Sequence, residues 1–363
     1  MGKLLRTGMG VLVVAVVGLA AVPAQARGIQ VNAGQSIQAA IDAAHPGDTI
    51  RVGPGVFQEN LTITKNRIHV VGAGIGQTVL EPGAEPTGPC ADPTIPETIN
   101  GVCVIGDFAP FATRKDALIK GFTIRNFPGF GVFAFNVSGL TVDEVEAEGN
   151  GGYGISGFVL HKVTFTDSIA HDNGEPGFYI GDSEDAAAVV KRNLAYRNGT
   201  GGEEGDGILI RDSSNGVVSD NTVFGNCVGI NVVDSGEAPI PAANWRVTDN
   251  TATGNNAPCA GEPDGPPPIS GIGILVLGAA NVLVEENTVT GNGPGAGGGP
   301  LPPGGIVVLS SLASGGADPT GVKVHDNKAT DNTPWDIFWD ESGTGNTFPG
   351  NHCAVSSPSW ICS

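Results

Sequence analysis

The sequence repeats a short unit, apolar-x-x-Asn-x-apolar-x-x-Asn, and this repeat constrains the fold more than any other feature. Clear copies occupy 190–198, 218–226, 247–255, 284–292 and 324–332, and degenerate copies occupy 142–150 and 165–173. Apolar residues recur inside each copy with the period of two that is typical of strands, and no helical pattern separates the copies. So many copies in one register indicate a repeat architecture rather than a chance resemblance.

A second motif, Gly-apolar-x-apolar, follows each of the later copies. It occupies 177–180, 207–210, 229–232, 273–276 and 305–308, and a variant at 336–339 begins with Asp336. The closing asparagines of successive copies lie between 23 and 40 positions apart, although the spacing inside each motif is constant. Constant motifs joined by variable connections predict an all-β fold, a single-stranded, right-handed parallel β-helix of about ten coils. Equivalent residues of successive coils should then stack about 4.8 Å apart.

The repeated asparagines favour a structural role. An Asn at each corner can bond its own backbone and the amide of the next coil, which forms a ladder along the stack. Ligand binding by these residues is the alternative, but such ladders need no ligand. The acidic residues that precede them, at 220, 249, 286 and 326, are expected to face solvent.

Both ends of a solenoid need covers, because its open ends expose the core. The segment 36–44 has one apolar face behind Ser36, a suitable N-cap, and predicts a short helix that covers the first coil. At the other end we expect a cap over 333–363, with Trp335, Trp339 and Trp360 in the last coil. Segments 81–100, 257–270 and 293–304 lack periodicity and are predicted loops.

The first 26 residues have the pattern of a signal peptide. Lys3 and Arg6 precede an apolar run over 8–22, and Ala24-Gln25-Ala26 has the small-x-small pattern of a cleavage site. A membrane anchor is the alternative, but the apolar run is short. We therefore predict a mature, secreted single domain over 27–363, without membrane insertion.

The six cysteines fall into three pairs that are close in sequence. These are Cys90 with Cys103, Cys227 with Cys259, and Cys353 with Cys362. Six cysteines allow fifteen connectivities, but distant coils cannot meet, so local disulfides are favoured. Metal binding by these cysteines is disfavoured, since the sequence has no Cys-x-x-Cys spacing.

The formal net charge of −19 limits the possible partners. Nucleic acids and anionic membranes are bound through Lys and Arg, so neither is expected. Polyanionic sugars are also disfavoured unless a cation bridges them. The simplest reading of the charge is solubility outside the cell.

The opening run "IQAAIDAA…GDTIRVGPG" over 37–55 resembles the first coil of pectin-lyase-like β-helix proteins. The Asn and Gly-Ile repeats resemble the carbohydrate-binding and sugar-hydrolase β-helix repeats. Those repeats also occur in periplasmic copper-associated accessory proteins of nitrous-oxide reductase. The resemblance covers nearly all of the mature chain and implies architecture rather than chemistry, because the superfamily includes lyases, hydrolases, epimerases, esterases and proteins without known activity.

The signatures of the individual enzyme families are missing. The sequence lacks the Gly-His-Gly and Arg-Ile-Lys of polygalacturonases, with 205–208 only faintly similar to their Asp motif. It also lacks the Gly-Asn-Val-Asp-Phe of pectin methylesterases, the Arg-x-Pro-x-x-Arg of pectate lyases and the Asp-Pro-His-Asp of alginate epimerases. Two Met and six scattered His give little support for copper. Whether the protein is an enzyme stays open, and a lyase, hydrolase or epimerase remain the candidates.

A site, if present, should lie on the outer side of the second motif in the middle coils. Residues two and four after the motif's Gly point outward, and equivalent turns follow it. The candidate catalytic residues are Asp182, Asp206, Arg211 and Asp212, and the candidate substrate-binding residues are Tyr179, Asn231 and Asp234. Carboxylates about 4.8 Å apart in neighbouring coils could share Ca²⁺ or a proton. The alternative is an Asp-Ser turn that bonds only its own backbone.

These observations lead to two functional hypotheses. The first is a secreted protein that binds or processes an extracellular polysaccharide in the outer groove of the middle coils. The second is a non-catalytic extracellular structural or adhesion solenoid, which the missing motifs and a scarcity of outward aromatic residues favour. The first rests on analogy between folds, since one fold hosts many functions.

Overall fold

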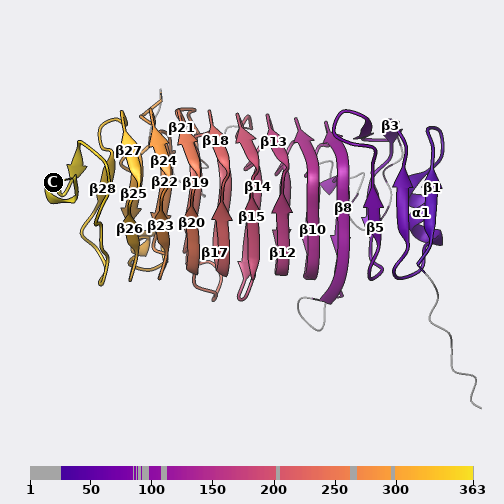
Figure 1. Cartoon of the computed structure of the whole chain (residues 1–363), viewed down its shortest axis with the longest axis horizontal. Coiled ribbons are helices and arrows are strands. Elements are labelled where there is room, and N and C mark those ends of the chain that lie inside the picture. The colour runs from indigo at the N-terminus through magenta and orange to yellow at the C-terminus, as the bar shows by residue number, and fades with distance from the viewer. Residues whose placement is uncertain are drawn as a thin grey trace, which may run out of the picture.

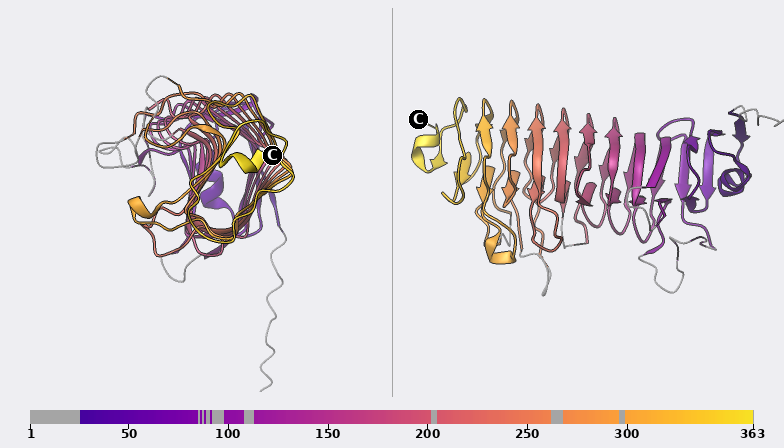
Figure 2. Two further views of the ribbon diagram at one scale, coloured as in Figure 1. Left: turned by 90° about the vertical axis from the view of Figure 1, so that its left-hand side faces the viewer. Right: turned by 90° about the horizontal axis from the view of Figure 1, so that it is seen from below.

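The chain winds into a parallel β-helix whose coils stack along one long axis (Figure 1). The computed structural model describes residues 26–84, 86, 88, 91, 98–107, 113–201, 205–261, 268–295 and 299–362. Viewed end-on, the coils superpose on one another around a common interior (Figure 2). Each strand pairs in parallel with the equivalent strands of neighbouring coils, as the repeat predicted.

The strands form three columns that run along the axis. The first column contains β1 (Gly28–Val31), β2 (Thr49–Val52), β5 (His69–Val71), β8 (Thr113–Arg125), β10 (Val137–Glu148), β12 (His161–Thr166), β15 (Ala188–Lys191), β17 (Asp206–Ser219), β20 (Ala243–Thr248), β23 (Leu283–Glu285) and β26 (Lys323–His325). The second contains β3 (Gly55–Gln58), β6 (Thr78–Glu81), β13 (Ile169–His171), β16 (Leu194–Tyr196), β18 (Thr222–Phe224), β21 (Thr251–Thr253), β24 (Thr288–Thr290) and β27 (Lys328–Thr330), together with the later halves of β8 and β10.

The third column carries the second sequence motif. It contains β4 (Leu61–Ile63), β7 (Val102–Ile105), β9 (Val132–Phe135), β11 (Ile155–Phe158), β14 (Phe178–Ser183), the first half of β17, β19 (Val228–Val233), β22 (Ile272–Leu277), β25 (Gly304–Leu309), β28 (Ile337–Trp339) and β29 (Ser356–Ser357). One α-helix, α1 (Ile37–Ala43), and two short 3₁₀ helices, η2 (Leu312–Ser314) and η3 (Ser359–Cys362), complete the described elements.

The core is made of stacked apolar residues from all three columns. In the first column Val218, Val247, Val284 and Val324 lie in register and are fully buried. The inward residues of the second column, Val or Ala at 223, 252, 289 and 329, are likewise in register and fully buried. Burial of apolar surface lowers the free energy of folding by roughly 25 cal/mol per Å². Because the buried surface of each coil lies against the coils before and after it, each coil is stabilised mainly by these two neighbours.

Two asparagine ladders run along the corners of the stack, as the sequence predicted. The inner ladder of closing asparagines joins 150, 173, 198, 226, 255, 292 and 332, and each Nδ2 donates to the Oδ1 of the next at 2.9–3.1 Å. The other ladder joins 193, 221, 250, 287, 327 and 351 in the same way, at 2.9–3.0 Å. Each Oδ1 also accepts a backbone N–H, so the buried corners are satisfied without a ligand.

The Gly that begins most copies of the second motif makes room for the inner ladder. A Cβ on Gly207 would lie 2.9 Å from Nδ2 of Asn226, and a Cβ on Gly229 would lie 2.8 Å from Nδ2 of Asn255. Both distances are shorter than Cβ contacts in folded proteins, so only Gly fits here. The two sequence motifs therefore pack together: the side-chain amide of the closing Asn in the first motif occupies the space where a Cβ on the Gly of the second motif would lie.

Helix α1 covers the first coil, within the segment 36–44 where a helix was predicted (Figure 1). The hydroxyl of Ser36 accepts from the backbone N–H of Ala39 at 3.1 Å, and Glu59 accepts from the N–H of Ile37 at 2.6 Å. At the other end Lys65 donates to the carbonyls of Asp42 and Ala44 at 2.5 and 3.0 Å. Oppositely charged side chains thus bind both ends of this short helix.

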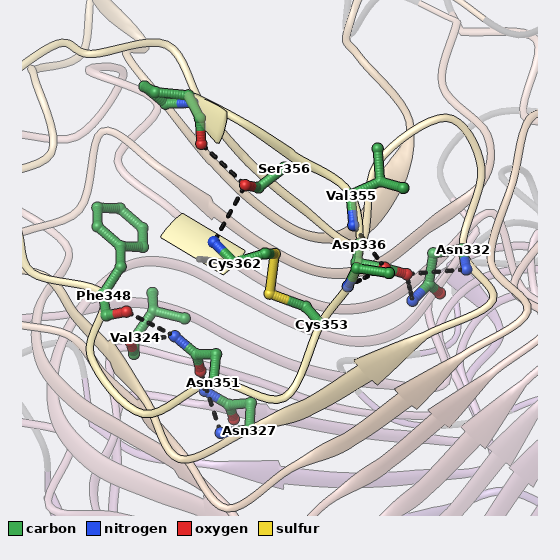
Figure 3. The surroundings of a disulfide bond; sticks show 12 residues. Val324, Asn327, Asn332, Asp336, Phe348, Asn351, Cys353, Val355, Ser356 and Cys362 are labelled. Carbon is green, nitrogen blue, oxygen red and sulfur yellow. Dashed lines mark hydrogen bonds between the residues drawn. A yellow bond between two sulfur atoms is a disulfide. The ribbon is translucent and has the colours of Figure 1, made fainter. Parts of the chain in front are cut away.

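The last coil ends both ladders and is closed by the Cys353–Cys362 disulfide (Figure 3). Trp339 packs against the core and makes an edge contact with Trp360, at 6.2 Å between ring centroids. Trp360 itself is 52% exposed, and Trp335 lies beside Phe338 on the outer face. The three tryptophans therefore do not share the single capping role that the sequence suggested, and Phe348 and Ile361 supply the other apolar contacts.

The described residues contain two of the predicted disulfides. Cys227 is bonded to Cys259 and Cys353 to Cys362. Cys103 is also disulfide-bonded, whereas Cys90 lies outside the described residues. Residues 1–25, which hold nearly all of the predicted signal peptide, lie outside them as well, so that assignment stays a prediction. Within the described part of the chain, no helix has the length and apolar character needed to span a membrane.

Candidate functional site

The outer face of the third column holds the residues that were predicted to form a site. Tyr179, Leu209 and Asn231 lie in register on β14, β17 and β19, and their neighbours along each strand point into the core. Tyr179 and Leu209 belong to a separate apolar cluster outside the main core. The outward direction was therefore predicted correctly, although Tyr179 is only 3% exposed.

Three of the candidate carboxylates occupy one equivalent turn in successive coils. Asp182 and Asp212 follow paired residues of β14 and β17, and Asp234 follows the paired end of β19. Asp182 and Asp212 both adopt left-handed backbone conformations, with φ of 50° and 46°. Asp and Asn tolerate this conformation better than most residues, which explains the acidic residue at this turn.

Asp212 is the buried centre of this row. It is 1% exposed, and it accepts hydrogen bonds from the backbone N–H of Ser235 at 2.7 Å and from the Ser235 hydroxyl at 2.5 Å. Burial and repulsion from Asp212 raise the pKa of Asp182 above its usual range. The same two causes raise the pKa of Asp234, against backbone hydrogen bonds from Gly236 and Ala242 that lower it. Neighbouring carboxylates thus favour the protonated form of the outer two.

Asp206 and Asn231 form a second buried pair on the same face. Nδ2 of Asn231 donates to Asp206 at 3.1 Å, and Oδ1 of Asn231 is a buried atom without a hydrogen bond. Arg211 forms an ion pair with Glu237, and its Nε lies 3.8 Å from Oδ2 of Asp212. Arg211 is therefore bound to acidic partners on this face.

An open groove of about 960 Å³ begins beside Asp182. Its lining comes from the turn after β11 and the start of β12, from the end of β14 and the turn after it, and from the loop after β19. It consists of Val159, Leu160, His161, Asp182, Ser183, Glu184, Asp185, Glu237, Ala238, Pro239 and Ile240. Of the predicted site residues, Asp182 alone lines this groove. Asp206, Asp212 and Asp234 are buried and do not line it, and Arg211 reaches it through its ion pair with Glu237.

A patch of aromatic residues lies next to the groove, on the outer face of β9, β11 and β14. The aromatic patch consists of Phe130, Phe133, Phe135, Tyr153, Phe158 and Tyr179. The rings of Tyr153 and Tyr179 stack with centroids 4.6 Å apart, and Phe158 lies 4.7 Å from Tyr179. The first five residues are half-buried, so their rings contribute to the surface. Val159 of the groove follows Phe158 directly in sequence, so the groove and the patch adjoin at this position.

Sequence reasoning missed this patch, although the signal was present. Phe133 and Phe135 stand two and four positions after Gly131, and Phe158 stands four positions after Gly154. These are the outward positions of the second motif in earlier, degenerate copies. The expected scarcity of outward aromatic residues is therefore wrong for these coils.

In the described part of the later coils, apolar residues cover this side. Leu275 and Val307, at the positions equivalent to Tyr179, are fully buried in a cluster with Ile269 and Leu301. Ile269 and Leu301 come from the predicted loops 257–270 and 293–304, the first of which the Cys227–Cys259 disulfide ties down. Ile269 and Leu301 thus cover the outer face of these coils, whereas the groove and patch lie over the preceding ones.

One group among the described residues has the composition of a metal site. The ligand atoms of Glu285, His325 and Asp326 lie within 4.8 Å of one another. Nδ1 of His325 contacts both carboxylates, at 3.4 Å to Glu285 and 3.1 Å to Asp326. Hydrogen bonding explains this arrangement without an ion.

A model of the right-handed β-helix region matches residues 98–204 and 186–329 of this chain, which is more than half of its length. The chain belongs to this family of right-handed β-helix proteins. This result agrees with the pectin-lyase-like architecture that the repeats predicted.

Curated relatives share part of the chain. Mannuronan C5-epimerase AlgE1 of Azotobacter vinelandii is 29% identical over 245 residues, which is 61% of this chain and 16% of the relative. Alginate lyase 7 of the same organism is 30% identical over 189 residues, 46% of this chain and 21% of the relative. This chain therefore spans about a fifth or less of the length of these relatives.

Solved structures confirm the fold. The A-module of Azotobacter vinelandii mannuronan C-5 epimerase AlgE6 matches with a TM-score of 0.60 at 20% identity, over 88% of this chain and 94% of that one. The Dettilon tailspike protein matches with a TM-score of 0.57 at 13% identity, over 91% of this chain and 60% of that one. At these identities the likeness concerns the β-helix alone.

Proposed function

We propose that this protein is exported and binds or processes an extracellular polysaccharide on the outer face of β9, β11 and β14. The observation that carries the proposal is the aromatic patch that continues into the open, carboxylate-lined groove beside Asp182. Concave surfaces with apolar rings and a few polar groups are typical of small-molecule and glycan sites. Pyranose rings have apolar faces that can stack on such rings, while their hydroxyls bond to carboxylates.

The relatives support the same class of ligand. Their names describe enzymes that act on mannuronan and alginate, both of which are polysaccharides. The disulfides agree with export, because such bonds persist in oxidising compartments.

Asp182 is the residue best placed for chemistry. Polysaccharide lyases, hydrolases and epimerases all move a proton, and a carboxyl group with a raised pKa holds a proton closer to neutral pH. Asp182 lines the groove, whereas Asp206 and Asp212 are buried and hydrogen-bonded within the fold. In this proposal Asp212 acts on Asp182 through its charge, and Tyr179 supports the aromatic patch from below.

The structural or adhesion solenoid remains the second candidate. The observation that favours it is that both carboxylate oxygens of Asp212 accept hydrogen bonds from Ser235. Such bonds are typical of Asp-Ser turns that have a purely structural role. In that case the carboxylates of the row would stabilise the coils and would have no substrate.

A polysaccharide panel separates these possibilities. Mature protein is incubated with neutral and uronic polysaccharides, with Ca²⁺ or a chelator, and assayed for new reducing ends, for unsaturated uronate absorbance and for binding. Turnover that is lost in Asp182→Asn supports an enzyme. Asp249→Asn is the matched control, because Asp249 has the same left-handed conformation, with φ of 59°, and lies outside the groove.

The remaining outcomes also decide. Binding without turnover supports a binding protein that uses the aromatic patch. An absence of both binding and turnover across the panel overturns the proposal in favour of the structural solenoid.

A further inference from the structure

The charges around the groove constrain which polysaccharide can occupy it. Four carboxylates line it, from Asp182, Glu184, Asp185 and Glu237. The basic side chain among the described lining residues is His161, whose ring nitrogen already lies 2.7 Å from the carbonyl of Asp185 and 3.5 Å from its carboxylate. Arg211 approaches from β17 but is paired with Glu237. The groove therefore presents negative charge to a ligand.

The acidic side chains that define this field are accessible. Glu184 and Asp185 are exposed, and the Glu237 side chain is 72% exposed. No hydrogen bond of the Glu184 carboxylate is found among the described residues. The Glu184 carboxylate can therefore accept hydrogen bonds from a ligand directly, whereas Glu237 also pairs with Arg211 and Asp185 accepts from Asn215 at 3.0 Å.

The aromatic patch supplies the other half of the recognition surface. Half-buried rings from the two successive coils of β9 and β11, about 4.8 Å apart by strand spacing, offer an apolar strip, and the buried Tyr179 of the next coil packs beneath it. A chain of pyranose rings can lie along such a strip while its substituents face the groove that begins at Val159. The ligand should thus have apolar ring faces together with groups that complement carboxylates.

We propose that the polysaccharide bound here is an amino-sugar polymer, with ammonium groups that face Asp182, Glu184 and Glu237. This inference rests on the proposed function and names its ligand class. A uronic polymer would place carboxylates against carboxylates, and like charges in contact disfavour binding. An ammonium group forms charge-assisted hydrogen bonds with the same side chains.

The test compares oligosaccharides of matched length made of glucosamine, N-acetylglucosamine and mannuronate. Binding to the mature protein is measured by calorimetry at about pH 5.5, where ordinary Glu side chains are ionised, at low and high salt and with a chelator present. We expect the glucosamine oligomer to bind at least about tenfold more tightly than the other two, with an affinity that falls as salt rises.

A paired variant assigns the effect to the groove. Glu184→Gln with Glu237→Gln should weaken glucosamine binding by about threefold to tenfold and leave N-acetylglucosamine binding unchanged. Glu286→Gln with Glu341→Gln removes the same charge from exposed turns outside the groove and should change neither affinity.

Equal binding of the glucosamine and N-acetylglucosamine oligomers, or tighter binding of mannuronate, overturns the amino-sugar inference and leaves the proposed polysaccharide site standing. Equal losses in the groove variant and the control variant also overturn it, because the effect would then come from net charge alone. Failure of all three oligosaccharides to bind counts against the proposed function itself.

Discussion

The side-chain amide of Asn332 donates to Oδ1 of Asp336 at 3.2 Å, so the inner asparagine ladder ends on a carboxylate (Figure 3). Asp336 occupies the position that Gly has in earlier copies of the motif. The next residues, Ile306 after Gly305 and Ile337 after Asp336, are paired between neighbouring coils. Oδ1 of Asp336 replaces the next Asn of the ladder, and its Oδ2 accepts from the backbone N–H groups of Ala354 and Val355 at 2.9 and 3.1 Å. One side chain thus completes the ladder and fixes the final segment.

Replacement of Asp336 should therefore destabilise the C-terminal end. Asp336→Ala leaves the backbone N–H groups of Asn332, Ala354 and Val355 without their acceptor, at a cost of about 2–4 kcal/mol. Asp336→Asn keeps one oxygen and should cost less. Thermal melting followed by circular dichroism measures both, and Asp331→Asn, an exposed residue of the same coil, is the control. Equal melting temperatures for Asp336→Ala and the natural protein would contradict this role.

The spacing between the inner ladder and the motif's Gly gives a second prediction. A Cβ at Gly207 would lie 2.6 Å from the carbonyl oxygen of Gly229 and 2.9 Å from Nδ2 of Asn226. Gly207→Ala should therefore cost about 1–3 kcal/mol as overpacking forces the coils apart. Gly28→Ala is the control, because the nearest atom to its added Cβ is 3.8 Å away. Denaturant unfolding of the two variants should differ clearly, and equal stability would rule out the steric explanation.

The architecture could be predicted from the sequence because its signal is repeated. The register of Val218, Val247 and Val284, the ladders and helix α1 all follow from motifs that carry their own spacing. A β-helix makes such prediction possible, since each coil meets only its neighbours and local sequence decides the contacts.

The candidate site was predicted less well, for physical reasons. The outward direction of Tyr179 and Asn231 followed from strand periodicity, but their burial depends on side chains and loops from other coils. Periodicity gives a residue's direction and says nothing of what covers it. The aromatic patch could have been found from Phe133, Phe135 and Phe158, whereas the contribution of Glu237 to the groove depends on a loop without any repeat.

The Cys227–Cys259 disulfide gives a third prediction. It anchors the loop whose Ile269 packs on Leu275 and Val307 outside the main core. Cys227→Ser with Cys259→Ser should lower stability by roughly 2–4 kcal/mol and expose this outer cluster. Increased binding of a hydrophobic dye before the main unfolding transition is the expected readout. The control is Cys353→Ser with Cys362→Ser, which removes the disulfide at the end of the solenoid and should not produce early dye binding. Early dye binding by this control would show that the effect is not local to the Cys227–Cys259 loop.

Asp182 gives the last prediction, which concerns pH. Burial and the charge of Asp212 raise the pKa of Asp182 in the folded protein, so its ionised form costs folding free energy that the unfolded chain does not bear. This cost is fully present above the raised pKa and disappears as the pH falls below the ordinary value of 3.8. Asp182→Asn should therefore melt at a higher temperature than the natural protein at neutral pH, and the difference should shrink toward pH 4.

Asp220→Asn is the control for this prediction, with the opposite sign. A hydrogen bond from Lys191 lowers the pKa of Asp220, so its ionised form favours the folded state, and its removal should give no gain at neutral pH. Both residues have left-handed backbones that Asn tolerates. A gain in stability together with a loss of turnover or binding in Asp182→Asn would show that the charge of Asp182 beside Asp212 lowers the stability of the fold and is needed for function in the groove. Equal or lower stability of Asp182→Asn at neutral pH would contradict the electrostatic account of this turn.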